Sequence, residues 1–130
     1  MSYSETVLRH FWRPTNNHVM VGADAVGVAG VPTNGPFMVL YLRLEGDLIA
    51  EAAFQTHGCA PSIAAGSLLT SVLPGLSPLD ATRRWSEPAI HEALGGLPPH
   101  KRHCSALAAE ALRRAAQGPD TTHERDPEQR

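Results

Sequence analysis

The sequence predicts an α+β fold, in which a small three-stranded antiparallel sheet carries helices packed on one face. After one short N-terminal helix, segments with the pattern of strands come first, and segments with the period of helices follow them. This grouping favours an antiparallel sheet with segregated helices over alternating βαβ units. A short glycine-containing turn, Glu45-Gly46-Asp47, joins two of the strands as a hairpin connection.

Length and composition predict one folded domain. The chain has 130 residues, of which 42% are hydrophobic and 18% are charged, so it carries enough apolar surface for one self-sufficient core. The last stretch of the chain is polar and lacks a hydrophobic period. We therefore expect a domain at residues 1–117 and a disordered polar tail at residues 118–130.

Charge and hydropathy give no support for two classes of partner. The formal net charge is -2, with 11 basic and 13 acidic residues, which leaves no electrostatic footprint for nucleic acid or anionic lipid. The N-terminus lacks a signal-peptide pattern, and the most apolar stretch, Ala60–Leu73, is too short to span a bilayer. We expect a cytoplasmic protein that binds neither nucleic acid nor membrane.

The first half of the chain predicts one helix and three strands. Ser2 and Glu5 have the spacing of a capping box, and an apolar stripe with helical period follows them as far as Pro14. Three further segments have the composition of strands and are separated by turn residues. The predicted elements are the helix Tyr3–Trp12 and the strands Val19–Val28, Phe37–Leu44 and Leu48–Thr56.

The second half of the chain predicts helices. One helix starts just after Cys59, with Pro61 in its first turn, and ends before Pro74-Gly75. A proline-rich loop, Gly95–His103, precedes the last helix. The remaining predicted helices are Pro78–Arg84, Glu87–Leu94 with Ser86 as its N-cap, and Cys104–Ala116.

The two cysteines, Cys59 and Cys104, share one predicted setting, because each stands where a loop becomes the first turn of a helix. The free N–H groups and the positive dipole end of a helix favour an anion there, so both thiols are expected to ionise readily. Lys101 and His103 act in the same direction on Cys104. The alternative is that each cysteine is a small buried apolar side chain.

Two histidines are candidate ligands beside these thiols. His103 directly precedes Cys104, and the alternative is a loop histidine that bonds a backbone carbonyl. His57 precedes Cys59 by two positions, where the alternation of a strand fits a sheet histidine equally well. No enzyme is expected, because adjacent residues such as His103 and Cys104 rarely reach the geometry of a catalytic dyad.

Two motifs make the chain resemble a known family. The segments HGCAPSIAAGSLLT and LPPHKRHCSALAAEAL, with Tyr3-Ser4-Glu5 and a Gly-Val-Pro-x-x-Gly loop before them, resemble the IscU/NifU N-terminal family of iron-sulfur cluster scaffolds. The resemblance runs from about Ser2 to Ala116. It implies a small antiparallel sheet with helices, in agreement with the fold predicted above.

The resemblance also implies a ligand set. Members of the family assemble a cluster on three cysteines with help from an aspartate or a histidine. The matching positions here are Cys59, His103 and Cys104, with Cys104 as the acceptor of persulfide sulfur from a cysteine desulfurase and Lys101 beside it. The loop in which the family has Cys-Gly-Asp reads Asn34-Gly35-Pro36, so two site side chains are replaced.

The segment Leu97 to Lys101, LPPHK, resembles the loop that family members present to an Hsp70-type chaperone. His100 stands in it where an aliphatic residue is usual. The sequence leaves chaperone binding and homo-oligomerisation open.

Three functions remain open from the sequence. The first is an iron-sulfur cluster assembly scaffold that holds iron or a labile cluster through Cys59, His103 and Cys104. The second is a zinc-binding module that uses the same donors, with His57 or water as the fourth ligand. The third is a degenerate scaffold that acts as an interaction or regulatory partner of the assembly machinery, which the changes at Asn34 and Pro36 suggest. In the first case a fourth ligand must come from His57, a second subunit, a partner or a small thiol.

Overall fold

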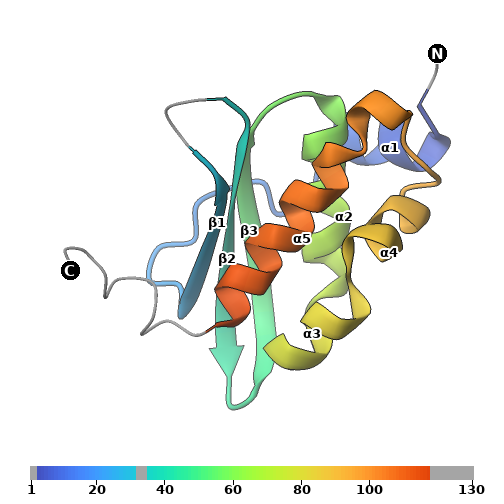
Figure 1. Cartoon of the computed structure of the whole chain (residues 1–130). Helices are drawn as coiled ribbons and strands as arrows, with labels where there is room; N and C mark the ends of the chain where they lie inside the picture. Colours follow the sequence, from blue (N-terminus) through green and yellow to red (C-terminus); the bar gives the residue numbers. More distant parts are fainter. Residues whose placement is uncertain (1–2, 32–34, 118–130) are drawn as a thin grey trace.

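The computed structural model describes residues 3–31 and 35–117, so Ser2, Asn34 and the predicted tail lie outside the described residues. Figure 1 shows a three-stranded sheet with the helices gathered on one of its faces, and this confirms the predicted α+β fold. The elements are α1 (Glu5–Trp12), β1 (Ala25–Gly30), β2 (Phe37–Glu45), β3 (Leu48–His57), α2 (Ala60–Val72), α3 (Pro78–Arg84), α4 (Glu87–Ala93), a 3₁₀ turn (Pro99–Lys101) and α5 (His103–Ala116).

The sheet is an antiparallel meander in the order β1-β2-β3. Side chains alternate along the central strand β2, where Met38, Leu40 and Leu42 are fully buried. The predicted hairpin at Glu45-Gly46-Asp47 joins β2 and β3, and Gly46 adopts the left-handed conformation with φ 64°. The buried side chains of the sheet and those of the helices form one hydrophobic core.

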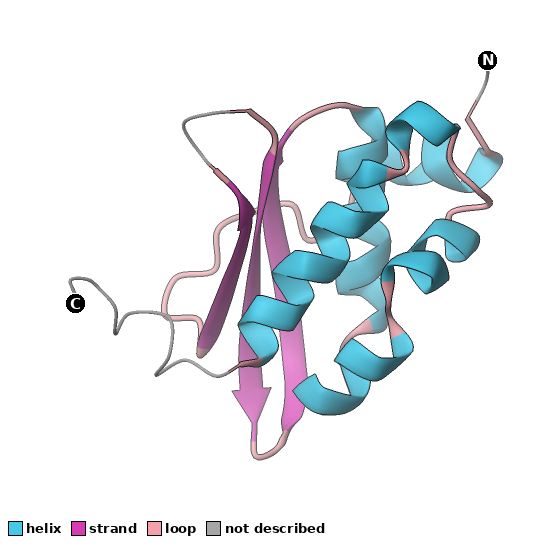
Figure 2. Cartoon of the chain, viewed as in Figure 1, coloured by secondary structure: helices cyan, strands magenta, loops and turns pink. Residues whose placement is uncertain are grey.

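Helix α5 lies directly on the sheet because β1 offers a glycine at the contact. A Cβ atom on Gly27 would lie 2.1 Å from the carbonyl oxygen of Ala111 and 2.4 Å from the backbone nitrogen of Ala115. Helix α2 packs beside α5 and against β3, where Gly66 leaves room for the ring of Phe54. As a result the N-terminal ends of α2 and α5 reach the same end of the molecule, as Figure 2 shows.

The first strand begins later than the sequence predicts. The prediction placed it at Val19–Val28, but the paired residues are Ala25–Gly30. Val19 and Val21 are exposed and lie before the first residue of β1 that pairs with β2. Just ahead of them the Asn16 carbonyl accepts a hydrogen bond from the Phe54 amide at 2.9 Å. Alternating apolar residues therefore line the surface here and do not form a strand.

Most helix boundaries agree with the prediction within two residues. Helix α3 has its predicted bounds, and α4 ends one residue early. The first helix begins at Glu5 and not at Tyr3, because Ser4 is the N-cap and its hydroxyl accepts a hydrogen bond from the Val7 amide at 3.1 Å. The last helix begins one residue before Cys104.

No helix in the part of the chain that the structure describes has both the length and the apolar run that a bilayer crossing needs.

Candidate functional site: a thiol pair at two helix starts

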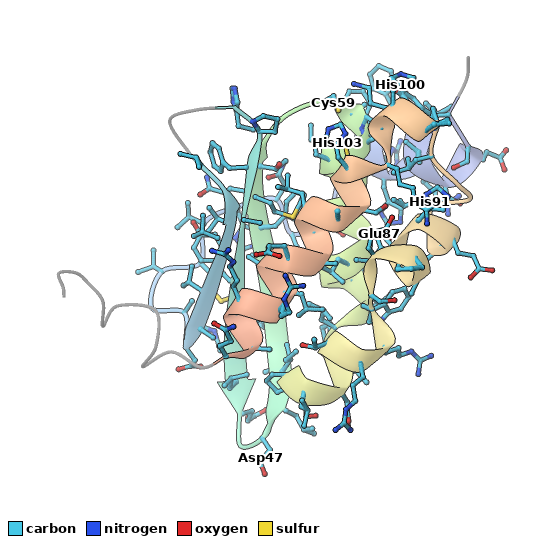
Figure 3. The ribbon with its side chains drawn as sticks, in the orientation of Figure 1. Asp47, Cys59, Glu87, His91, His100 and His103 are labelled. Carbon is cyan, nitrogen blue, oxygen red and sulfur yellow. The ribbon has the colours of Figure 1, made fainter. Side chains whose placement is uncertain are left out.

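The two cysteines meet at the N-terminal ends of α2 and α5, as the sequence predicts. Cys59 is the N-cap of α2, and Cys104 is the second residue of α5. Their Sγ atoms are 3.7 Å apart, although 45 positions separate them in the chain. A disulfide bond is about 2.05 Å long, so both cysteines are free thiols in contact. Figure 3 shows Cys59 at the same end of the molecule as His103.

The spacing of the two sulfurs is that of two ligands on one metal ion. Thiolate sulfur lies about 2.3 Å from zinc, and tetrahedral angles then set two sulfurs about 3.8 Å apart. The observed 3.7 Å between Cys59 Sγ and Cys104 Sγ matches this value. The fold therefore supplies two sulfur donors at a coordination distance without rearrangement of the backbone.

The two thiols differ in exposure. Cys104 is only 1% exposed and belongs to the hydrophobic core, because α5 packs on the sheet at this point. Cys59 is half-buried and packs against the edge of that core. The pair therefore has one member that a solute can reach and one that lies behind it.

The electrostatics of the pair correct the expectation that both thiols ionise readily. Burial alone would raise the pKa of Cys59, but hydrogen bonds from Cys104 and Ser62 and the charge of Lys101 lower it overall. The pKa of Cys104 is raised to about 12, first by burial and then by the neighbouring negative charge of Cys59. Cys59 is therefore the first of the two to ionise, and the Cys104 S–H can donate to the thiolate that forms there.

Lys101 stands beside the site, as the resemblance implies, but it acts mainly on Cys59. The charge of the Cys59 thiolate is the largest cause that raises the pKa of Lys101, and Cys104 contributes least. Lys101 ends the 3₁₀ turn that leads into α5, and its amide donates to the Pro98 carbonyl at 2.8 Å. Its ammonium group therefore balances the thiolate at the outer edge of the pair.

His103 stands next to Cys104 at the start of α5. Its Nε2 atom is 3.7 Å from Cys104 Sγ, close to the roughly 3.6 Å expected between imidazole and thiolate ligands of one tetrahedral metal. The described residues nevertheless contain no group of three or more His, Cys, Asp or Glu side chains already arranged to hold a metal ion. The donors Cys59, Cys104 and His103 therefore form an open row and not a closed cage.

His57 ends β3 and is exposed, with its imidazole stacked on the ring of Phe37 at a centroid distance of 5.9 Å. In this conformation its ring packs on a residue of the sheet. His57 therefore has the role of a sheet histidine, which was the alternative to a ligand. Its use as a ligand requires the ring to leave Phe37.

Sequence reasoning missed three residues that shape the site. Ser62, buried in the first turn of α2, donates to the Cys59 carbonyl at 2.9 Å, and its hydroxyl lies 3.9 Å from Cys59 Sγ. Arg102 binds Glu87 of α4 at 2.6 Å and so fixes the turn that precedes His103. The contact between Cys59 and Ser62 could have been predicted, because the two residues have the spacing from N-cap to N3 of a helix. Nothing in the local sequence indicates the ion pair between Arg102 and Glu87.

The proline-rich segment is partly hidden. Leu97 and Pro98 are buried, whereas Pro99 and His100 are exposed. Of the two replaced positions, Pro36 is exposed just before β2, and Asn34 lies outside the described residues.

Comparison with known proteins gives a consistent result. Residues 2–122 match the family described as NifU-like N terminal domain. The iron-sulfur cluster assembly scaffold protein IscU 1 of Archaeoglobus fulgidus is 42% identical over 113 residues, which cover 87% of this chain and 73% of that protein. IscU of Aquifex aeolicus is 39% identical over 112 residues, which cover 85% and 71%. The nitrogen fixation protein NifU of Azotobacter chroococcum is 40% identical over 115 residues, which cover 87% of this chain and 37% of that protein.

Solved structures show the same fold. A crystal structure of a protein ascribed to the SUF system of Fervidobacterium islandicum has a TM-score of 0.70 at 21% identity and covers 88% of this chain and 96% of its own. The N-terminal part of a NifU-like protein from Brucella abortus has a TM-score of 0.56 at 20% identity and covers 85% and 76%.

Proposed function

Because this chain belongs to the NifU-like N-terminal domain family, we propose that it is an iron-sulfur cluster assembly scaffold. In this proposal the cargo is iron or a labile iron-sulfur cluster, held through Cys59, Cys104 and His103. Two relatives, 42% and 39% identical over most of the chain, are named as iron-sulfur cluster assembly scaffold proteins. A scaffold of this kind binds and hands on its cargo and needs no catalytic dyad.

The observation that carries the proposal is the 3.7 Å contact between Cys59 Sγ and Cys104 Sγ. Iron in clusters prefers thiolate ligands and accepts imidazole in place of some of them. A labile cargo also needs an opening, which the half-buried Cys59 provides.

The ligand shell needs movement and one further donor. His103 is exposed, so its ring has room to turn toward the sulfurs. With two thiolates and one imidazole, a four-coordinate iron lacks one ligand, and Pro36 has no donor atom to offer. We propose that His57, a second copy of the chain, a partner protein or a small thiol completes the shell.

Sulfur arrives, in this proposal, as a persulfide from a cysteine desulfurase. The acceptor that the resemblance implies is Cys104, with Lys101 assisting, but Cys104 is buried, so we propose that the half-buried Cys59 is where the sulfur enters the pair. The charge of Lys101 beside the pair suits it to accompany an incoming sulfur anion. An Hsp70-type chaperone is a second proposed partner, through the segment from Leu97 to Lys101. Its exposed part is Pro99-His100, so docking on Leu97 requires this segment to open.

Anaerobic reconstitution tests the proposal. The full chain, incubated with ferrous iron and sulfide, should develop visible charge-transfer absorbance. Cys59→Ala and Cys104→Ala should abolish it, and His103→Ala should weaken it. His18→Ala is the matched control, because His18 is exposed and its ring bonds the Val19 carbonyl far along the chain from the thiols. A colourless wild-type protein with intact thiols would contradict the proposal.

Zinc is the second candidate cargo, because two sulfurs at 3.7 Å suit tetrahedral zinc as well as iron. Metal analysis of protein purified without chelators separates the two. One zinc per chain that excess ferrous iron does not displace would favour a zinc module. A chain that binds neither metal would favour a role as an interaction partner of the assembly machinery.

A further inference from the structure

We propose that Cys59 and Cys104 act as a dithiol that reduces sulfane sulfur to sulfide, so that the pair itself supplies the two electrons for one sulfide per cycle. This inference deepens the proposed scaffold function, on which its biological use rests. The chemical substrate is the terminal sulfur of a persulfide. Three features of the structure carry the argument.

The first feature is contact between the only two cysteines of the chain. The sequence holds two cysteines, and their Sγ atoms are 3.7 Å apart. A sulfur atom placed on either thiol is therefore always next to the other thiol. No third cysteine of this chain is available to receive it instead.

The second feature is the unequal access to the pair. Cys59 is half-buried at the N-cap of α2, whereas Cys104 is 1% exposed within the core. A persulfide donor therefore meets Cys59 first. Cys104 is shielded from the donor but not from Cys59, which gives the pair an entering thiol and a resolving thiol.

The third feature is the absence of a ready-made metal cage, since the described residues hold no group of three or more His, Cys, Asp or Glu side chains placed for a metal ion. Without metal, nothing in this part of the chain separates the two sulfurs. To form a disulfide the two Sγ atoms move from 3.7 Å to roughly 2.05 Å.

The reaction has two steps. The Cys59 thiolate attacks the terminal sulfur of a donor R–S–SH, so that the S–S bond of the donor breaks, RS⁻ leaves, and a persulfide forms on Cys59. The Cys104 sulfur, giving up its proton, then attacks Cys59 Sγ. The bond from Cys59 Sγ to the terminal sulfur breaks, and HS⁻ leaves and takes the proton as H₂S.

The electrons balance within the pair. The two thiol sulfurs lose two electrons on forming the Cys59–Cys104 disulfide, and the sulfane sulfur gains both on becoming sulfide. A dithiol reductant is needed to open the disulfide before a second cycle. Without that reductant the chain is limited to a single turnover.

The experiment uses the full, reduced, metal-free chain in chelator, with glutathione persulfide as the probe and excess thiol removed. Released sulfide is measured, and the state of both cysteines is mapped by mass spectrometry of unreduced peptides. The wild type should release up to one sulfide per chain and should accumulate the Cys59–Cys104 disulfide in the same proportion. A protein-free sample corrects for decay of the probe.

Two variants separate the steps. Cys104→Ser should stop at a stable persulfide on Cys59, with sulfide release at the protein-free level. Cys59→Ser should give neither persulfide nor sulfide, because Cys104 is buried and the persulfide donor cannot reach its sulfur. Circular dichroism checks that each variant is folded, and the wild-type ratio of disulfide to sulfide remains decisive if one of them is not.

The proposal is overturned by a stable persulfide on the wild type without sulfide release, or by Cys104→Ser releasing as much sulfide as the wild type. Iron binding by the same preparations is measured separately. If the wild type binds iron but keeps a stable persulfide, the dithiol inference is wrong and the scaffold function stands. Sulfide release without iron binding would remove the scaffold function and leave the dithiol chemistry standing.

Discussion

Cys59 and Cys104 touch through their sulfur atoms, yet their surroundings push their acidities apart. The pKa of Cys104 is raised to about 12 by burial and by the charge of Cys59. The pKa of Cys59 lies below its ordinary value because its favourable hydrogen bonds and Lys101 outweigh its burial. Cys59 is thus the thiol that ionises first, with Cys104 as its neutral neighbour.

Alkylation should distinguish the two thiols. At pH 8 iodoacetamide should modify Cys59 at least about tenfold faster than Cys104, because the thiolate is the nucleophile and one pKa unit is a factor of ten in its population. Peptide mass mapping at several times measures both rates. Cys104→Ala should slow the reaction of Cys59, since the hydrogen bond that lowers its pKa is lost. Equal rates at the two cysteines in the folded wild type would contradict the assignment.

Alkaline pH should destabilise the fold through Cys104. Its pKa is 9.0 when unperturbed and about 12 in the fold, so between these values the unfolded chain has lost a proton that the folded chain keeps. The free energy of unfolding should therefore be fully retained below pH 9 and fall as the pH rises toward 12. Urea unfolding at pH 8 and pH 10 measures the loss. Cys104→Ala should lose less stability over this range, and an equal loss would refute the prediction.

Gly27→Ala should destabilise the protein by about 2–3 kcal/mol, because the new Cβ meets backbone atoms of α5 that have no flexible side chain to move. Gly46→Ala is the matched control. Gly46 has nothing within 4 Å of the new Cβ, and its φ of 64° alone costs about 1 kcal/mol. Thermal or urea unfolding compares the two variants. A smaller loss for Gly27→Ala than for Gly46→Ala would show that α5 does not lie directly on β1.

Ser105→Ala should raise the free energy of unfolding by about 1 kcal/mol. The Ser105 hydroxyl is fully buried and has no hydrogen-bond partner among the described residues. Removal of an unsatisfied buried hydroxyl recovers its cost of desolvation. Ser62→Ala is the contrasting variant and should lower stability, because the Ser62 hydroxyl donates to the Cys59 carbonyl. Destabilisation by Ser105→Ala would point to a bond that this hydroxyl makes in solution.

The elements that the sequence predicts well are those with local signals. Ser77 precedes α3, and Pro78 starts it, so cap and proline fix its start. The β2–β3 hairpin follows from its glycine turn. The start of β1 was mispredicted because Val19 and Val21 alternate like strand residues but have no neighbouring strand, and only the pairing of Ala25 with Leu42 reveals where β1 begins.

The sequence indicates that the two cysteines stand at helix starts, but it does not indicate how their electrostatics differ. Helix starts at Cys59 and Cys104 are visible in the sequence, and the family resemblance brings both together with His103. The unequal burial of the two thiols depends on tertiary packing, because Cys104 belongs to the hydrophobic core and Cys59 only packs against it. Dipole reasoning from the helix ends alone therefore gave the wrong direction for the pKa of Cys104.

The central claim is that the two sulfurs bind one metal atom together, and X-ray absorption at the iron edge of the anaerobically iron-loaded chain tests it most directly. We predict two sulfur scatterers from the protein per iron at about 2.3 Å, with the remaining positions taken by nitrogen or oxygen. The sulfur shell should disappear in the double variant Cys59→Ala/Cys104→Ala. An iron shell of nitrogen and oxygen alone in the wild type, with both thiols reduced, would contradict the account.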